Sequence, residues 1–113
     1  AFEIESIMYS GPIERDILRV AVIGGSGAKY IGQAISRGAD ALVTGDIGYH
    51  DYLEAGNSIL LLDATHRATE LPSLEAVKRT LLKLFSEYID VFVDYGAALP
   101  ITVMCGSSNC ERA

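Results

Sequence analysis

The stretch "RVAVIGGSGAKYIGQAISRGADALVTGD", residues 19–46, places a glycine-rich turn and a helix-like segment between two short apolar runs. The first run, residues 17–25, is rich in β-branched residues and ends in glycines, which is typical of a buried strand, and residues 40–44 form a second. Between them, the apolar residues 28, 31, 34 and 35 share one helical face, with Ser26 suited to cap this helix and Gly38 suited to end it. This unit predicts two parallel strands of one sheet.

The alternation of strand and helix continues along the chain. Residues 47–56 predict a short helix with Asp46 as its N-cap, and the apolar residues 58–64 predict a third strand. A long amphipathic helix covers residues 73–89 and is expected to start near Thr69, because Pro72 fits only a first helical turn. Residues 90–96 and 98–104 predict one or two more strands, and residues 2–6 could add another. The fold class is therefore α/β, a mostly parallel or mixed sheet covered by helices, in a single domain over residues 1–113.

Composition narrows the class of protein. Of the 113 residues, 50% are hydrophobic, enough for a real core, and the net charge of −6 comes without a Lys or Arg cluster. A nucleic-acid polymer is therefore not an expected partner. No run approaches the roughly 20 apolar residues of a membrane span, and no signal peptide opens the chain, so we expect a cytoplasmic protein without membrane contact. Cys105 and Cys110 are interpreted as free thiols rather than a disulfide.

Acidic residues and both histidines follow the predicted strands. Asp46 and His50 come after the second strand, and His66 and Glu70 come after the third. The carboxyl ends of parallel strands meet at one rim of the sheet, where ligands gather in such folds. We therefore predict that these side chains converge on one site.

Each of these residues has a functional and a structural interpretation. Asp46 could bind a metal, act as a general base or only cap a helix, and His50, one helical turn later, could rest on its carboxylate or lie free on the surface. His66 and Glu70 have the spacing of two ligands on one ion, although this spacing is common by chance. Asp63 could join the same rim as a further ligand, or it could only turn the chain after the strand, which is the interpretation we favour.

The glycine turn has two interpretations as well. Gly25, Ser26 and Gly27 follow a strand and precede a helix, so their amides could bind an anion or the turn could only allow close packing. The turn is not a Walker A loop, and Tyr30 at the third glycine position argues against a dinucleotide fingerprint.

The order of these motifs resembles a known family. "RVAVIGGSGAKYIGQAISRGADALVTGDIGYHDYLEAG" followed by "ILLLDATHRATE" is similar to the C-terminal half of the Nif-three family, whose members are often called GTP cyclohydrolase 1 type 2. The similarity spans about residues 19–70. Three positions depart from the usual family pattern, namely Thr65 in place of Gly, Arg67 in place of an aromatic residue, and Gly48 in place of a basic residue.

The resemblance implies a dinuclear metal site inside a ring-shaped homo-hexamer. His66 and Glu70 correspond to the C-terminal metal ligands for zinc, manganese or iron, while Asp46 and His50 correspond to motifs near the site, where they would position or activate water. The remaining ligands lie in an N-terminal half that this sequence lacks, so we interpret the chain as a fragment or a half-length relative.

Two functions follow as alternatives. The first alternative is that the chain is part of a metal-dependent hydrolase, which acts on a small anionic or nucleotide substrate and is complete only with its other half. The second alternative is a non-catalytic domain for oligomerisation or protein interaction.

Overall fold

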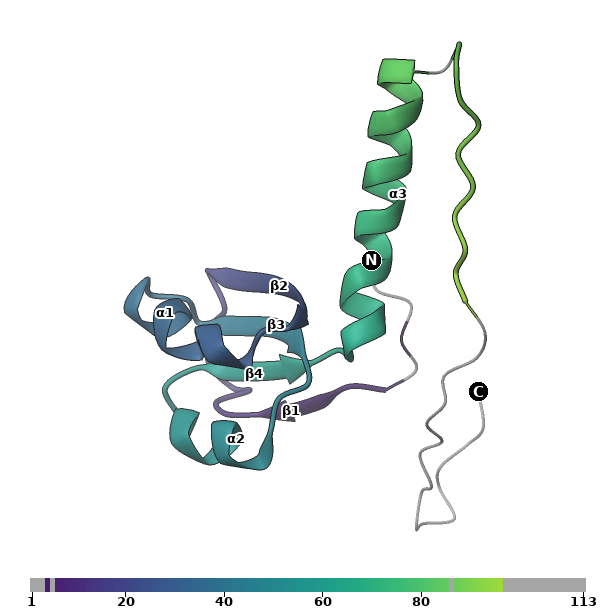
Figure 1. Ribbon diagram of the computed structural model, residues 1–113. Helices are drawn as coiled ribbons and strands as arrows, with labels where there is room; N and C mark the ends of the chain where they lie inside the picture. Colours follow the sequence, from purple (N-terminus) through teal and green to yellow (C-terminus); the bar gives the residue numbers. More distant parts are fainter. Residues whose placement is uncertain (1–3, 5, 86, 97–113) are drawn as a thin grey trace.

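Four strands form a mixed sheet in the order β1-β4-β3-β2 in a computed structural model, which describes residue 4, residues 6–85 and residues 87–96 (Figure 1). The parallel strands are β2 (Val20–Ser26), β3 (Ala41–Gly45) and β4 (Leu60–Asp63). The short β1 (Met8–Ser10) adds to β4 in the antiparallel direction. The predicted α/β class with a mixed sheet and covering helices is confirmed.

The helices follow the strands in alternation. A 3-10 turn, η1 (Ala28–Tyr30), leads into α1 (Ile31–Ser36), and α2 (Tyr49–Ala55) follows β3. The long α3 (His66–Phe85) starts at the end of β4 and extends away from the sheet, with residues 87–96 running back beside it (Figure 1). In the part of the chain that the structure describes, no helix has the length and apolar character needed to cross a membrane.

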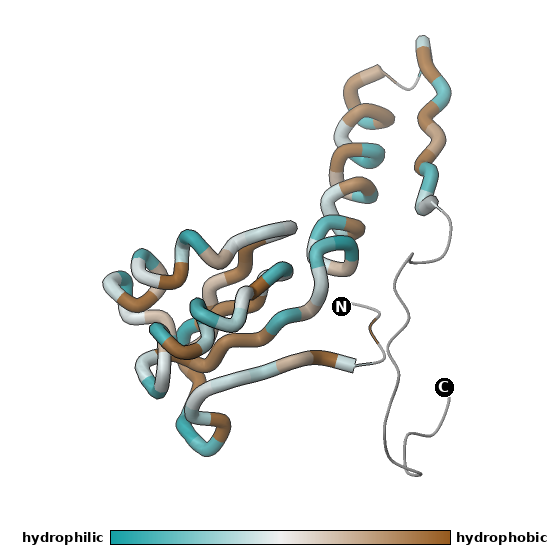
Figure 2. The backbone as a smooth tube through the Cα atoms, turned by 60° about the horizontal axis from the view of Figure 1, so that its bottom comes forward, coloured by the Kyte–Doolittle hydropathy of each residue, from teal (hydrophilic) through white to brown (hydrophobic). Residues whose placement is uncertain are grey.

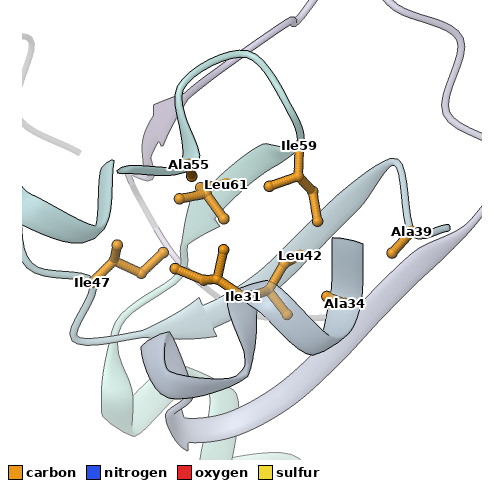
Figure 3. Packing of buried hydrophobic residues seen from close by; sticks show 8 residues of the cluster. All are labelled: Ile31, Ala34, Ala39, Leu42, Ile47, Ala55, Ile59 and Leu61. Atoms are coloured by element: carbon orange, nitrogen blue, oxygen red, sulfur yellow. The ribbon is translucent and has the colours of Figure 1, made fainter. Parts of the chain in front are cut away.

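The core lies between one face of the sheet and the helices α1 and α2. Leu42 and Leu61 are buried at the centre of β3 and β4, and Ile31 and Ala55 pack onto them from the two helices (Figure 3). The C-terminal end of α1 is closed by paired backbone hydrogen bonds, from Gly38 N–H to the Ile35 carbonyl and from Ala39 N–H to the Ala34 carbonyl. This position of Gly38 just after the helix was predicted from the sequence.

The opposite face of the sheet carries a row of apolar side chains that α1 and α2 do not cover. Val22, Val43 and Leu62 are register partners across β2, β3 and β4, and Tyr9 of β1 stands opposite Leu62. Side chains alternate along a strand, so this row points away from Leu42 and Leu61. Val22 is 59% exposed and Tyr9 is 54% exposed.

Several expected element boundaries are wrong. Ser26 does not cap a helix, because it ends β2 and pairs with Gly45. Helix α2 begins after Gly48, whose N–H is bound by the Asp51 carboxylate, and therefore Asp46 is not its N-cap. The extra N-terminal strand lies at Met8–Ser10 rather than at residues 2–6, of which residues 4 and 6 are described and are not in a strand.

Of the two strands predicted near the C-terminus, the first is wrong and the second lies outside the described residues. Residues 90–96 do not form a strand. Tyr95 in this segment donates a hydrogen bond to Glu75, and residues 87–96 follow α3 instead of joining the sheet (Figure 1). The expected strand at 98–104 and both cysteines lie outside the described residues.

Candidate metal centre

His66 is the first residue of α3 and stands at the carboxyl end of β4. Thr65 caps this helix, because its hydroxyl accepts a hydrogen bond from the Ala68 N–H at 3.3 Å. The expectation that α3 starts near Thr69, with His66 in a preceding loop, is therefore wrong. Pro72 lies inside the helix. With Thr65 as the cap, the helix starts about one turn before the position near Thr69 that Pro72 predicted.

Thr65 has a backbone conformation that a β-branched residue rarely adopts. Its φ is +67°, in the left-handed region where glycine is favoured. Glycine, which the resemblance led us to expect at this position, would adopt this φ without strain. In this chain Thr65 combines backbone strain with the capping hydroxyl, and the two act on stability in opposite directions.

The imidazole of His66 lies between two carboxylates. Its Nδ1 is 2.5 Å from Asp46 Oδ2, at the end of β3, and its Nε2 is 3.1 Å from Glu70 Oε1, one turn later in α3. All three side chains come from the rim where the strands β3 and β4 end, as predicted. About half of the surface of each of the His66, Asp46 and Glu70 side chains is exposed, so the group is open to ions from solvent.

The hydrogen bond that Nδ1 donates to Asp46 is the largest effect on the pKa of His66 and raises it above its ordinary value of 6.5. Burial lowers this pKa to a smaller extent, and the charge of Glu70 raises it by less again. An ionised carboxylate can only accept a hydrogen bond, so Nδ1 carries the proton that it shares with Asp46. A neutral His66 then directs its Nε2 lone pair at an oxygen of Glu70. Two acceptors this close repel each other unless a proton or another cation lies between them.

The distance between these two atoms fits a shared metal ion. Metal–nitrogen and metal–oxygen bonds of about 2.0–2.1 Å place two ligands of one ion roughly 2.9 Å apart at a right angle and roughly 3.4 Å apart at the tetrahedral angle. The 3.1 Å between His66 Nε2 and Glu70 Oε1 falls between these values. Within residues 6–85 and 87–96, however, no group of three or more His, Cys, Asp or Glu side chains is arranged around one point. The residues present therefore fit part of a metal site.

Two glycines allow α3 to approach the sheet at this point. A Cβ on Gly45 would lie 2.6 Å from the Cα of His66, and one on Gly25 would lie 2.6 Å from Glu70 Oε1 and 3.1 Å from His66 Nε2. Gly25 also has a φ of +68°. Both positions leave no room for a side chain, so the glycine turn serves to bring the backbone of β2 and β3 against the start of α3.

Two buried threonines complete this contact. The sequence did not indicate Thr44, and it predicted Thr69 only as a helix cap, not as a partner of Gly25. The Gly25 N–H donates to Thr69 Oγ1 at 2.8 Å, and the Thr44 hydroxyl donates to the Gly25 carbonyl at 3.0 Å. Thr44 is fully buried and Thr69 nearly so. A threonine at the end of a strand or in the first turn of a helix is common, so neither residue carries a distinctive sequence signal. Their contacts with Gly25 become visible only in the folded structure.

Gly25, Ser26 and Gly27, where the sequence predicted a possible anion site, are largely engaged in contacts within the protein. The Gly25 amide is already used by Thr69, Ser26 lies in β2, and the Gly27 carbonyl accepts the N–H of Tyr30. This arrangement favours the close-packing interpretation of the turn. The role in anion binding stays a prediction.

His50 lacks the contact with Asp46 that was considered for it, whereas Asp63 has the chain-turning role that was expected. None of the hydrogen bonds of the described residues joins His50 to Asp46; the His50 ring packs edge-on against Tyr49 on α2. Asp63 is buried and accepts hydrogen bonds from the N–H groups of Ile47 and Thr65, both at 2.9 Å. Asp63 therefore fixes the two loops that carry Asp46 and His66, in agreement with its interpretation as a chain-turning residue.

A separate cleft of about 360 Å³ lies between α1 and α2. Lys29, Asp51 and Glu54 provide its charged side chains, above apolar residues of both helices. Two acidic groups against one lysine do not favour an anion there. None of the predicted site residues lines this cleft.

The fold and the site together define a class of protein. It is a small α/β domain with a His–Glu pair at the rim where the parallel strands end. The family model described as Duf34/NIF3 (NGG1p interacting factor 3) matches residues 1–95. The chain belongs to this family, as its sequence motifs predicted.

Curated relatives agree with this assignment. A GTP cyclohydrolase 1 type 2 homolog of Staphylococcus aureus (strain Mu50) is 40% identical over 93 residues, which is 80% of this chain and 25% of the relative. A protein of the same name from Clostridium acetobutylicum is 39% identical over 84 residues, 72% of this chain and 31% of the relative. The chain thus spans about a quarter to a third of the length of these relatives.

Solved structures show the same fold. The crystal structure of Staphylococcus aureus protein SA1388 aligns with a TM-score of 0.80 and 34% identity, covering 91% of this chain and 30% of that one. A Bacillus cereus protein related to NIF3 aligns with a TM-score of 0.67 and 31% identity, covering 73% of this chain and 22% of that one.

Replacing Gly25 by Ala should destabilise the protein. The added methyl group meets Glu70 and His66, and a side chain at positive φ adds about 1–2 kcal/mol of backbone strain. Gly32→Ala in α1 is the matched control, because a Cβ there has nothing within 4 Å and should stabilise the helix by up to about 1 kcal/mol. Urea unfolding measures both; equal stabilities for the two variants would contradict the close packing at Gly25.

The imidazole of His66 should titrate above its ordinary pKa in the metal-free protein. Because the folded pKa is raised, the Asp46–His66 interaction stabilises the fold fully at pH below the ordinary value and is lost as the pH rises through the raised one. An NMR titration of the ring protons measures this pKa. Asp46→Asn should lower it, and an unchanged value in that variant would refute Asp46 as the main cause.

Proposed function

We propose that this chain supplies His66 and Glu70 as two ligands of a divalent metal centre in a metal-dependent hydrolase, with the other ligands coming from outside the described residues. The observation that carries the proposal is the approach of two potential ligand atoms, His66 Nε2 and Glu70 Oε1, which lie 3.1 Å apart at an open rim. The names of the relatives, GTP cyclohydrolase 1 type 2 homolog, support a hydrolytic reaction on a small anionic or nucleotide substrate.

Two residues would bind the ion directly, and three others keep these two ligands in position. His66 and Glu70 would bind zinc, manganese or iron, because imidazole and carboxylate together suit these ions. Such an ion would lower the pKa of a bound water and so provide a nucleophile near neutral pH. Thr65, Thr69 and Gly25 keep the first turn of α3, and with it both ligands, in place against the sheet.

Metal binding provides the direct test. Titration calorimetry of the purified chain with Zn²⁺ or Mn²⁺ should show weak binding that His66→Ala abolishes and Glu70→Gln reduces, with Glu54→Gln on α2 as a control that leaves it unchanged. Affinity should rise as the pH passes through the raised pKa of His66, above the ordinary value of 6.5, because the metal must displace the Nε2 proton. Equal affinities for His66→Ala and the unchanged chain would refute the proposed ligands.

A second function, in protein assembly, is favoured by the uncovered face of the sheet. A largely parallel sheet is normally covered on both faces, and here Val22, Val43, Leu62 and Tyr9 form an apolar row on the face that α1 and α2 leave open. Apolar segments also lie along α3 where it stands clear of the sheet (Figure 2). We propose that a second copy of this chain is the partner, consistent with the homo-oligomer, a hexamer, that the resembled family implies.

Assembly can be tested by light scattering after size-exclusion chromatography. Val22→Lys places a charge in the apolar row and should shift the protein towards the monomer by raising the dissociation constant at least tenfold. Leu53→Lys on α2, which is 61% exposed on the other side of the sheet, is the matched control. Circular dichroism of each variant establishes that it is folded; a folded Val22→Lys variant with unchanged mass would contradict this interface.

A further inference from the structure

The contact between Asp46 and His66 determines which nitrogen of the imidazole can face a metal ion. Asp46 Oδ2 accepts a hydrogen bond from Nδ1 at 2.5 Å, and only Nε2 is left to face Glu70 Oε1. Among the described residues, Asp46 contacts no other partner by hydrogen bond or ion pair. Its carboxylate therefore lies on the side of the ring opposite to Glu70.

The backbone around Asp46 is built to hold this position. Asp46 has a φ of +55°, a left-handed conformation that Asp adopts more readily than most residues, directly after the end of β3. The neighbouring Ile47 N–H is held by the buried Asp63, whose other oxygen holds the Thr65 N–H beside His66. One buried carboxylate thus ties the Asp46 loop to the start of α3, so the distance between Asp46 and His66 does not depend on flexible side chains alone.

We propose that Asp46 is a positioning residue that fixes the tautomer and orientation of His66, so that Nε2 faces the metal position beside Glu70. This inference rests on the proposed metal centre and replaces the water-activating role that the sequence predicted for Asp46. A carboxylate that accepts the second N–H of a metal-binding histidine raises the basicity of the ring and saves the entropy of orienting it. Asp46 contacts the Nδ1 edge of the ring and does not face the position between Nε2 and Glu70 Oε1.

Asp46→Asn is the variant that tests this role, since Asn tolerates the same backbone conformation and has nearly the same shape. Loss of such a partner typically weakens metal affinity by about 10–100-fold, and we expect a change in this range for Zn²⁺ by titration calorimetry. Asp51→Asn is the matched control, because it removes a carboxylate charge from the first turn of α2, where an amide oxygen can still bind the Gly48 N–H. Its affinity should be unchanged.

Long-range ¹H–¹⁵N NMR spectra of the metal-free protein, recorded where the ring of His66 is neutral, give a second readout. The unchanged chain should show the Nδ1–H tautomer only, and Asp46→Asn should show a mixture. Retention of both the tautomer and the affinity in Asp46→Asn would overturn the positioning role and leave the metal centre standing. Loss of affinity as complete as in His66→Ala, with the tautomer unchanged, would also overturn it, because Asp46 would then be a ligand itself.

The tautomer separates this inference from the proposed function. If neither the unchanged chain nor any variant binds metal, the proposed centre fails for this chain. The fixed Nδ1–H tautomer and its loss in Asp46→Asn would still support the orienting role, whereas a mixture of tautomers in the unchanged chain would refute it.

Discussion

The close approach of α3 to the ends of β2 and β3 is the constraint on which the site depends. Gly25 and Gly45 leave no space for a side chain, and the Gly25 N–H and carbonyl are bound by Thr69 and Thr44. Because these bonds are buried, breaking one leaves an unsatisfied polar group away from water, which typically costs about 1–3 kcal/mol. The first turn of α3 is thereby fixed on the rim, and His66 with it.

This constraint explains why the imidazole and two carboxylates from different elements meet. Asp46 arrives from β3 and Glu70 from α3, and Asp63 connects the two loops through the N–H groups of Ile47 and Thr65. An exposed histidine with free rotation would sample many orientations. Between Asp46 and Glu70 it has one nitrogen for each partner, and such an arrangement suits a residue that must present a single nitrogen to an ion.

The same structure leaves apolar surface that a complete α/β layer arrangement would cover. One face of the sheet packs on α1 and α2 through Leu42 and Leu61, while the row that includes Val22 and Tyr9 stays exposed. A largely parallel sheet is normally covered by other protein on both faces. The proposed metal centre and this surface support the same interpretation, because both proposals require ligands or contacts that the described residues do not supply.

The sequence by itself determined the α/β class, the presence of three buried strands that alternate with helices, the family and the gathering of Asp46, His66 and Glu70 at one rim. These follow from periodicity, glycines and motif order, which are local properties. Only the tertiary structure decided that Asp46 contacts His66 rather than His50, that α3 begins at His66 despite Pro72, and that the glycine turn packs against Thr69. Each of these depends on residues about 20 to 44 positions apart or on a cap at positive φ, and no local pattern encodes such contacts.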